Sequence, residues 1–165
     1  DRVEKYIPPK KGRKHVLRVI REALFFEPAH LGTDVQAALD FLNSVSKRRA
    51  VVFLVSDFLT SGYERSLQVS NKRHDIIALM IQDPRETVLP DIGIMELQDT
   101  ETGEVVVVDT HDVNMRKGFQ TLSEQDVRER DRFFKQIDID TVLLRTDQSY
   151  TDPLIRFFRS REKRR

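Results

Sequence analysis

The chain has 165 residues, which is enough for one domain with a hydrophobic core of its own. Its 28 Lys and Arg residues nearly balance 27 Asp and Glu residues, so the net charge of +1 gives no general reason to expect a nucleic-acid partner. The absence of Cys excludes disulfides and thiolate metal sites and fits a reducing, cytoplasmic location. No apolar run approaches the roughly 18 residues of a membrane span, and no signal peptide is visible.

The first part of the chain predicts a strand end followed by two helices. Residues 3–7 are expected to end a strand that Pro8 and Pro9 close. Apolar residues recur at helical spacing from 16 to 24, and the second helix is expected to open at Thr33, with Thr33 and Gln36 as a capping box. Because the chain opens without Met at a strand-like segment, we expect it to be the C-terminal part of a longer protein.

The run from Val51 to Val55 is the most distinctive stretch of the sequence. Its unbroken apolar, β-branched composition predicts a strand buried on both faces, as in a parallel sheet covered by helices. The run ends at Ser56 and Asp57. Asp57 is therefore expected at the carboxyl end of the strand, the end of the sheet at which open α/β folds bind ligands.

The rest of the chain continues the alternation of helices and strands. The expected elements are a helix from about 61 to 73, a strand over 75–81, a hairpin insertion over 92–108, a long charged helix over 112–137, a strand over 139–144, a helix from about 153, and a basic tail over 159–165. The pattern predicts a single three-layer α/β domain over 1–165 with a mostly parallel sheet. The hairpin would be an insertion or an antiparallel edge.

Each of the three predicted parallel strands leads into an Asp, namely Asp57, Asp83 and Asp147. Parallel strands share a direction, so these carboxylates are expected at the same end of the sheet. An Asp-Pro turn explains Asp83 equally well, and an Asx turn or helix start explains Asp147. Asp57 is the preferred candidate because it is predicted to follow the most buried strand and has Ser56 beside it.

Thr33 is the second candidate residue. As an N-cap its hydroxyl would contribute about 1 kcal/mol to stability, which explains the residue fully. Alternatively, the hydroxyl could bind a hard cation such as Mg²⁺ together with the Asp57 carboxylate.

Several segments resemble known families. Gly32-Thr33 at the start of a helix, followed by a strand that ends in Ser56-Asp57, resembles the second and third motifs of a von Willebrand factor A domain. More closely, the chain resembles the bacterial proteins of the domain-of-unknown-function family fifty-eight in Arg48–Phe58, Arg73–Leu79, Asp83–Glu86, Leu89–Gly93, Glu101–Glu104 and Thr146–Phe158. That family is von Willebrand A-like and is typically encoded beside MoxR-type AAA+ ATPases.

The resemblance implies a non-enzymatic protein-interaction domain that is a partner of a MoxR-type AAA+ ATPase in protein assembly or activation. It also implies a metal ion-dependent adhesion site with Thr33 and Asp57 as ligands. The first motif of that site, Asp-x-Ser-x-Ser, does not occur in the 165 residues. We therefore expect an incomplete site, with Mg²⁺ or Mn²⁺ bound only in a longer protein.

The same resemblance places a first central strand beside Val51–Val55, and that strand would be missing from the chain. The exposed edge could then pair in a homodimer, exchange elements, or be filled by the N-terminal segment.

The alternative function is a metal-dependent phosphoryl-transfer or hydrolase domain that uses Asp57, Asp83 and Asp147. The chain lacks a Walker phosphate loop, a dinucleotide Gly motif and a nucleophile elbow, which disfavours it. The four His residues have no ligand spacing. The basic runs at 10–14, 48–49 and 159–165 are short, and solvated helix ends explain them better than a nucleic-acid interface does.

Overall fold

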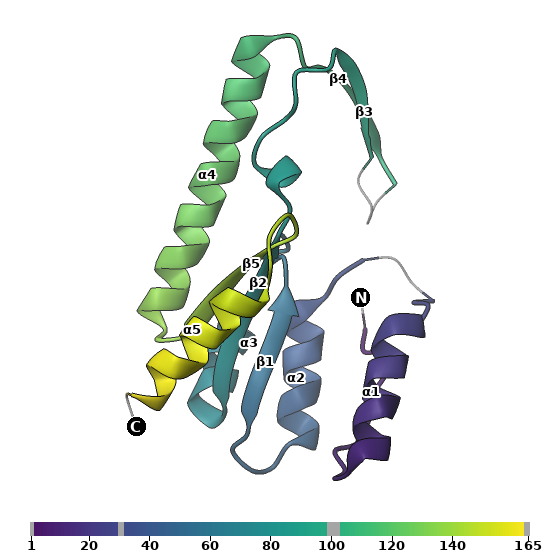
Figure 1. Ribbon diagram of the computed structural model, residues 1–165, viewed down its shortest axis with the longest axis vertical. Helices are drawn as coiled ribbons and strands as arrows, with labels where there is room; N and C mark the ends of the chain where they lie inside the picture. The colour runs from purple at the N-terminus through teal and green to yellow at the C-terminus, as the bar shows by residue number, and fades with distance from the viewer. Residues whose placement is uncertain (1, 30–31, 99–102, 164–165) are drawn as a thin grey trace.

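The computed structural model describes residues 2–29, 32–98 and 103–163. Its helices and strands are α1 (Arg13–Phe25), α2 (Val35–Val45), β1 (Val51–Ser56), α3 (Glu64–Arg73), β2 (Asp75–Gln82), a short 3-10 helix (Pro84–Glu86), β3 (Ile94–Gln98), β4 (Val105–Asp109), α4 (Val113–Gln136), β5 (Asp140–Arg145) and α5 (Thr151–Glu162). Figure 1 shows their arrangement. His30, the hairpin turn over 99–102 and the tail end at 164–165 lie outside the described residues.

The main sheet is parallel, with the strand order β1-β2-β5. Val55 of β1 pairs with Leu79 of β2, which in turn pairs with Val142 of β5. Strands β3 and β4 form a separate antiparallel pair. The predicted α/β class, the mostly parallel sheet and the hairpin strands are therefore confirmed.

Helices cover both faces of the central strand. On one face, Ile76, Ala78 and Met80 of β2 pack in a core with residues of α2, α3 and α4, among them Leu39, Leu67 and Phe134. On the other face, Ile77 packs with Val142, Leu144 and two residues of α5, Leu154 and Phe157. The alternation of side chains along β2 thus divides the core into two halves.

The prediction that the Val51–Val55 strand is buried on both faces is wrong. Strand β1 lies at one edge of the sheet, and Val51, Phe53 and Val55 are 51%, 46% and 58% exposed. Helix α5 lies over β2 and β5 and reaches β1 through the Phe158 ring, whose centroid is 6.0 Å from that of Phe53. The most buried strand is β2, so the reason for preferring Asp57 over Asp83 fails.

The N-terminal segment differs from its predicted form. Residues 3–7 form no strand. Side chains anchor this segment instead: the Lys5 ammonium lies 2.9 Å from a Glu22 carboxylate oxygen of α1, and the Tyr6 ring packs edge-on against Phe41 of α2. The segment is therefore held between two helices and does not fill the open edge of β1.

One further local prediction is wrong. Helix α2 begins at Val35 and its N-cap is Asp34, whose carboxylate accepts a 2.7 Å hydrogen bond from the Ala37 backbone N–H, so Thr33 is not the cap. Leu122, in the first half of α4, is 64% exposed. The reason is visible in Figure 1, where the first half of α4 extends beyond the sheet toward the hairpin.

Helix α1 contributes no buried residue. In Figure 1 it stands beside α2, on the side of α2 away from the sheet. Among the described residues, no helix is long and apolar enough to cross a membrane.

Candidate functional site

The candidate site residues lie at the carboxyl ends of the three parallel strands. Asp57 follows β1, Asp83 follows β2 and Asp147 follows β5, so the parallel arrangement places all three at the same end of the sheet. The amino-terminal end of α2, which Thr33 precedes, lies at that end too (Figure 1).

Asp83 holds the turn after β2 and ties it to β5. One carboxylate oxygen accepts a hydrogen bond of 2.9 Å from the Arg85 backbone N–H, and the other accepts one of 2.9 Å from the Thr146 hydroxyl. Glu86 completes a capping box by accepting from the Asp83 N–H. The Arg85 N–H, followed by the Thr146 hydroxyl, lowers the pKa of Asp83. These contacts explain Asp83 as a structural residue.

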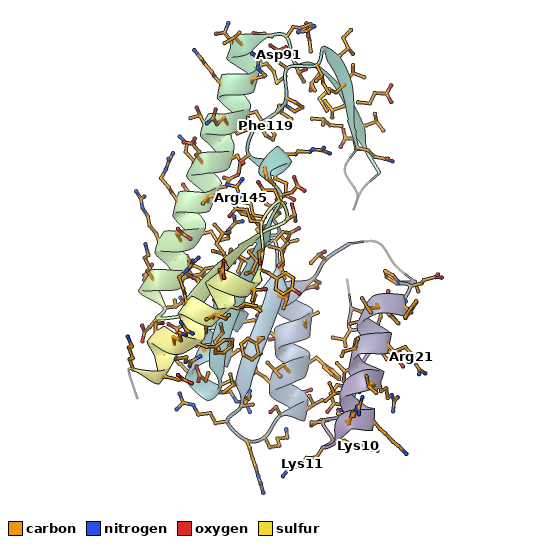
Figure 2. The ribbon with its side chains drawn as sticks, viewed as in Figure 1. Lys10, Lys11, Arg21, Asp91, Phe119 and Arg145 are labelled. Atoms are coloured by element: carbon orange, nitrogen blue, oxygen red, sulfur yellow. The ribbon has the colours of Figure 1, made fainter. Side chains whose placement is uncertain are left out.

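Asp147 is bound by its neighbour in the chain. The Arg145 guanidinium, labelled in Figure 2, donates two hydrogen bonds of 3.0 and 2.9 Å to the two carboxylate oxygens. The hydrogen bond from Arg145 lowers the pKa of Asp147, and the pair is exposed to solvent. The Thr146 hydroxyl, which donates to Asp83, joins the loops after β2 and β5. The charge of Asp147 is balanced by the adjacent Arg145 guanidinium.

Asp57 lies in a tight turn directly after β1. One carboxylate oxygen accepts from the Leu59 N–H at 3.2 Å and from the Ser56 hydroxyl at 3.4 Å. The Ser56 hydroxyl oxygen also accepts from the Phe58 N–H at 3.0 Å. Ser56 and Asp57 therefore shape the turn, and the hydrogen bonds that described residues make to Asp57 use one of its two oxygens.

Phe58 fixes this turn in place. Its φ of 58° lies in the left-handed region that bulky residues avoid, and its side chain is only 3% exposed. The ring packs against Tyr63 at 5.7 Å and Phe134 at 5.1 Å between centroids. The Arg130 guanidinium donates a 3.0 Å hydrogen bond to the Phe58 carbonyl oxygen. Burial of the ring thus imposes the backbone conformation that positions Asp57.

Sequence reasoning missed two arginines that hold the sheet ends. Arg130 lies in the helix predicted to be long and charged, yet it is part-buried and reaches the turn after β1. Arg161 of α5 binds the Asp75 carboxylate at the start of β2 and lies 3.6 Å from the Asp140 carboxylate at the start of β5. No pattern in the sequence identifies either, because both stand in runs of charged residues.

The structure does not bring the two expected metal ligands, Thr33 and Asp57, together. Thr33 is exposed, and the hydrogen bonds described above do not join it to Asp57. Within residues 2–29, 32–98 and 103–163, no group of three or more His, Cys, Asp or Glu side chains is placed to hold a metal ion. A hydroxyl and a carboxylate are ligands that suit Mg²⁺, but the ion prefers about six oxygens in octahedral geometry.

The chain is similar to several uncharacterized mycobacterial proteins. It is 31% identical over 160 residues to an uncharacterized protein of Mycobacterium avium, a match that covers 95% of this chain and 94% of the relative. It is 30% identical over 160 residues to uncharacterized proteins of Mycobacterium bovis and Mycobacterium tuberculosis, and it spans half the length of each. No solved structure matches the chain.

The family assignment rests on most of the chain. Residues 1–129 match the protein family of unknown function DUF58, and this stretch contains α1, both sheet strands up to β2, the hairpin strands and the first part of α4. The chain belongs to the DUF58 family.

Proposed function

We propose that this chain is a protein-interaction domain of the von Willebrand A-like kind, without catalytic activity of its own. In this proposal it acts in the cytoplasm with a MoxR-type AAA+ ATPase in the assembly or activation of other proteins. Its contact surface is the open edge of β1, where a von Willebrand A-like fold places a strand that these 165 residues do not supply, and an extended segment of the partner takes the place of that strand. The apolar, half-exposed edge of β1 is the observation that carries the proposal.

The backbone of β1 offers free hydrogen-bonding groups along this edge. The Asp75 N–H donates to the Ala50 carbonyl oxygen at 2.8 Å, so Ala50 and alternate residues after it turn their backbone groups toward β2. Val51, Phe53 and Val55 turn theirs the opposite way, and β1 has no second strand neighbour among the described strands. Such a row of donors and acceptors is a template for an added strand.

The side chains beside this edge favour an apolar partner. A hollow of about 260 Å³ lies between β1 and α5 and is lined in part by Val51, Ile77 and Phe158. Half-exposed apolar side chains gathered beside an open edge mark an interaction surface or an aggregation site.

The other edge of the sheet is protected. The residues of β5 that correspond in position are Thr141, Leu143 and Arg145, of which only Leu143 is apolar. Polar and charged residues on an edge strand oppose the addition of another strand. The contrast favours β1 as the edge that binds a partner.

Family likeness supports the choice of partner. The segments over 48–58, 73–79 and 146–158 resemble proteins encoded beside MoxR-type ATPases. The longer mycobacterial relatives contain about as many residues again as the matched half. We further propose that Thr33 and Asp57 bind Mg²⁺ or Mn²⁺ with ligands from outside these 165 residues. No specific observation favours a hydrolase, because Asp83 and Asp147 already bind local donors.

A binding assay with two matched proline variants tests the proposal. The protein is immobilised and titrated with a purified MoxR-type AAA+ ATPase of the same organism, and the dissociation constant is measured by interferometry. Val55→Pro removes a donor from the open β1 edge, whereas Leu143→Pro makes the same change on β5. We expect Val55→Pro to weaken binding at least tenfold and Leu143→Pro to leave it unchanged. Equal effects of the two variants, or no binding by the unmodified protein, would refute the proposal.

A further inference from the structure

The β3–β4 hairpin stands away from the main sheet as an arm. In Figure 1 it projects from the end of α4 that is remote from the sheet. Isolated two-stranded hairpins are marginally stable in water, so an arm of this kind gains from a partner that covers it.

The root of the arm is firmly fastened. Thr110 is fully buried; its hydroxyl donates to the Gly93 carbonyl oxygen at 2.6 Å and accepts from the Ile92 N–H at 3.0 Å. The Asp91 carboxylate, near the start of α4 in Figure 2, lies 2.6 Å from the His111 ring and 3.3 Å from the Arg116 guanidinium. The arm is thus held in a defined direction by its base.

One face of the arm combines apolar and acidic side chains. Cross-strand pairs place six exposed residues on it: Ile94, Glu96, Gln98, Val105, Val107 and Asp109. Ile94, Val105 and Val107 are 76%, 51% and 62% exposed. Two residues of this face, Glu96 and Asp109, are acidic, and residues 91–112 contain no Lys or Arg. This surface, the arm face, therefore suits a partner that is apolar and basic.

Helix α1 carries the complementary surface. Val16, Leu17, Ile20 and Leu24 form a stripe along the helix, the α1 stripe, and they are 55%, 53%, 49% and 72% exposed. Residues 10–21 contain six Lys and Arg and no Asp or Glu, and Lys14 and Arg21 border the stripe at helical spacing. The N-terminal segment contacts the other side of α1, where Lys5 pairs with Glu22 and the Lys10 N–H donates to the His15 ring.

The two surfaces also match in length. Helix α1 has 13 residues and so extends about 20 Å, while each arm strand has five residues and extends about 17 Å. We propose that the arm face of one copy of this chain docks on the α1 stripe of a second copy. Two copies that exchange arms form a closed dimer with two identical contacts. The contact is separate from the β1 edge and does not depend on the function proposed above.

Sedimentation velocity over a concentration series of the full chain tests this contact. We expect the mean mass to rise above 19.3 kDa with concentration, and association to weaken as salt is added. Ile94→Asp on the arm and Leu24→Asp on α1 each replace an exposed side chain, and each is expected to weaken association at least tenfold. Leu122→Asp, an exposed apolar position of α4, is the matched control and is expected to associate like the unmodified chain.

Mixing identifies which surfaces meet. An equimolar mixture of the Ile94→Asp and Leu24→Asp variants contains one intact arm face and one intact α1 stripe, so we expect it to associate more strongly than either variant alone. Val55→Pro should still associate, which separates this contact from one through β1. A chain that stays monomeric at every concentration overturns the proposal. The same holds if the monomeric chain binds anionic lipid vesicles through α1, because the stripe then serves a membrane surface and not a second copy. Full association of Ile94→Asp, or no gain on mixing, overturns it as well.

Discussion

The turn after β1 predicts an unusual order of stability among variants of Phe58. Its φ of 58° costs a residue with a side chain about 1–2 kcal/mol relative to glycine. Its ring is buried against Tyr63 and Phe134, and truncation of such a ring costs about 3–5 kcal/mol. Phe58→Ala loses the ring but keeps the strained backbone, whereas Phe58→Gly loses the ring and relieves the strain.

We therefore expect Phe58→Ala to lower the free energy of unfolding by about 3–5 kcal/mol. Phe58→Gly should be the more stable of the two, by about 1 kcal/mol. At a position with ordinary backbone angles the order is reversed, because glycine costs about 0.5–1 kcal/mol relative to alanine. Urea denaturation followed by circular dichroism measures both values. An alanine variant as stable as the glycine variant would refute the reasoning from backbone conformation.

Three further predictions concern other parts of the molecule. His74 is 1% exposed, and burial lowers its pKa. The unfolded chain therefore takes up a proton on this side chain at higher pH than the folded chain does. We expect the free energy of unfolding to fall as the pH drops below about 6.5. In His74→Leu the difference in urea midpoint between pH 8 and pH 5.5 should shrink; an unchanged difference would contradict this. Arg161→Met removes the guanidinium that pairs with the part-buried carboxylates of Asp75 and Asp140. We expect the free energy of unfolding, measured by thermal unfolding, to fall by about 1–3 kcal/mol. A change within error would show the ion pairs to be dispensable. In a form that carries the additional ligands of the proposed metal site, Mg²⁺ should raise the melting temperature, and it should not do so in the Asp57→Ala variant of that form. An equal rise in both would remove Asp57 from the metal site.

Periodicity and composition predicted the elements but not their neighbours. The runs over 75–81 and 139–144 are strands, and the helical spacing over 16–24 marks a helix, because these patterns depend on local structure. The Val51–Val55 run has the unbroken apolar composition of a central strand, yet it stands at an edge. Composition indicates that a strand is able to be buried, whereas its actual burial depends on which other segments are present to cover it.

The sequence predicted that the three strand-end aspartates lie together, but not which contacts they make. Parallel strands do bring Asp57, Asp83 and Asp147 to one end of the sheet. The sequence could not show that Thr146 and Arg145 occupy the last two, since these contacts depend on the orientation of loops. Nor could it show that Arg130, separated from Phe58 by 72 positions, holds the turn that carries Asp57.

The fastening at the root of the arm also has a consequence for how this protein can change. Gly93 and Thr110 are joined by hydrogen bonds through both the backbone and a side chain, so the chain enters and leaves the arm at nearly the same point. A segment with adjacent ends can grow, shrink or be exchanged without moving the elements on either side of it. The arm is therefore a module, whose length and surface can vary among relatives while the three parallel strands keep their register.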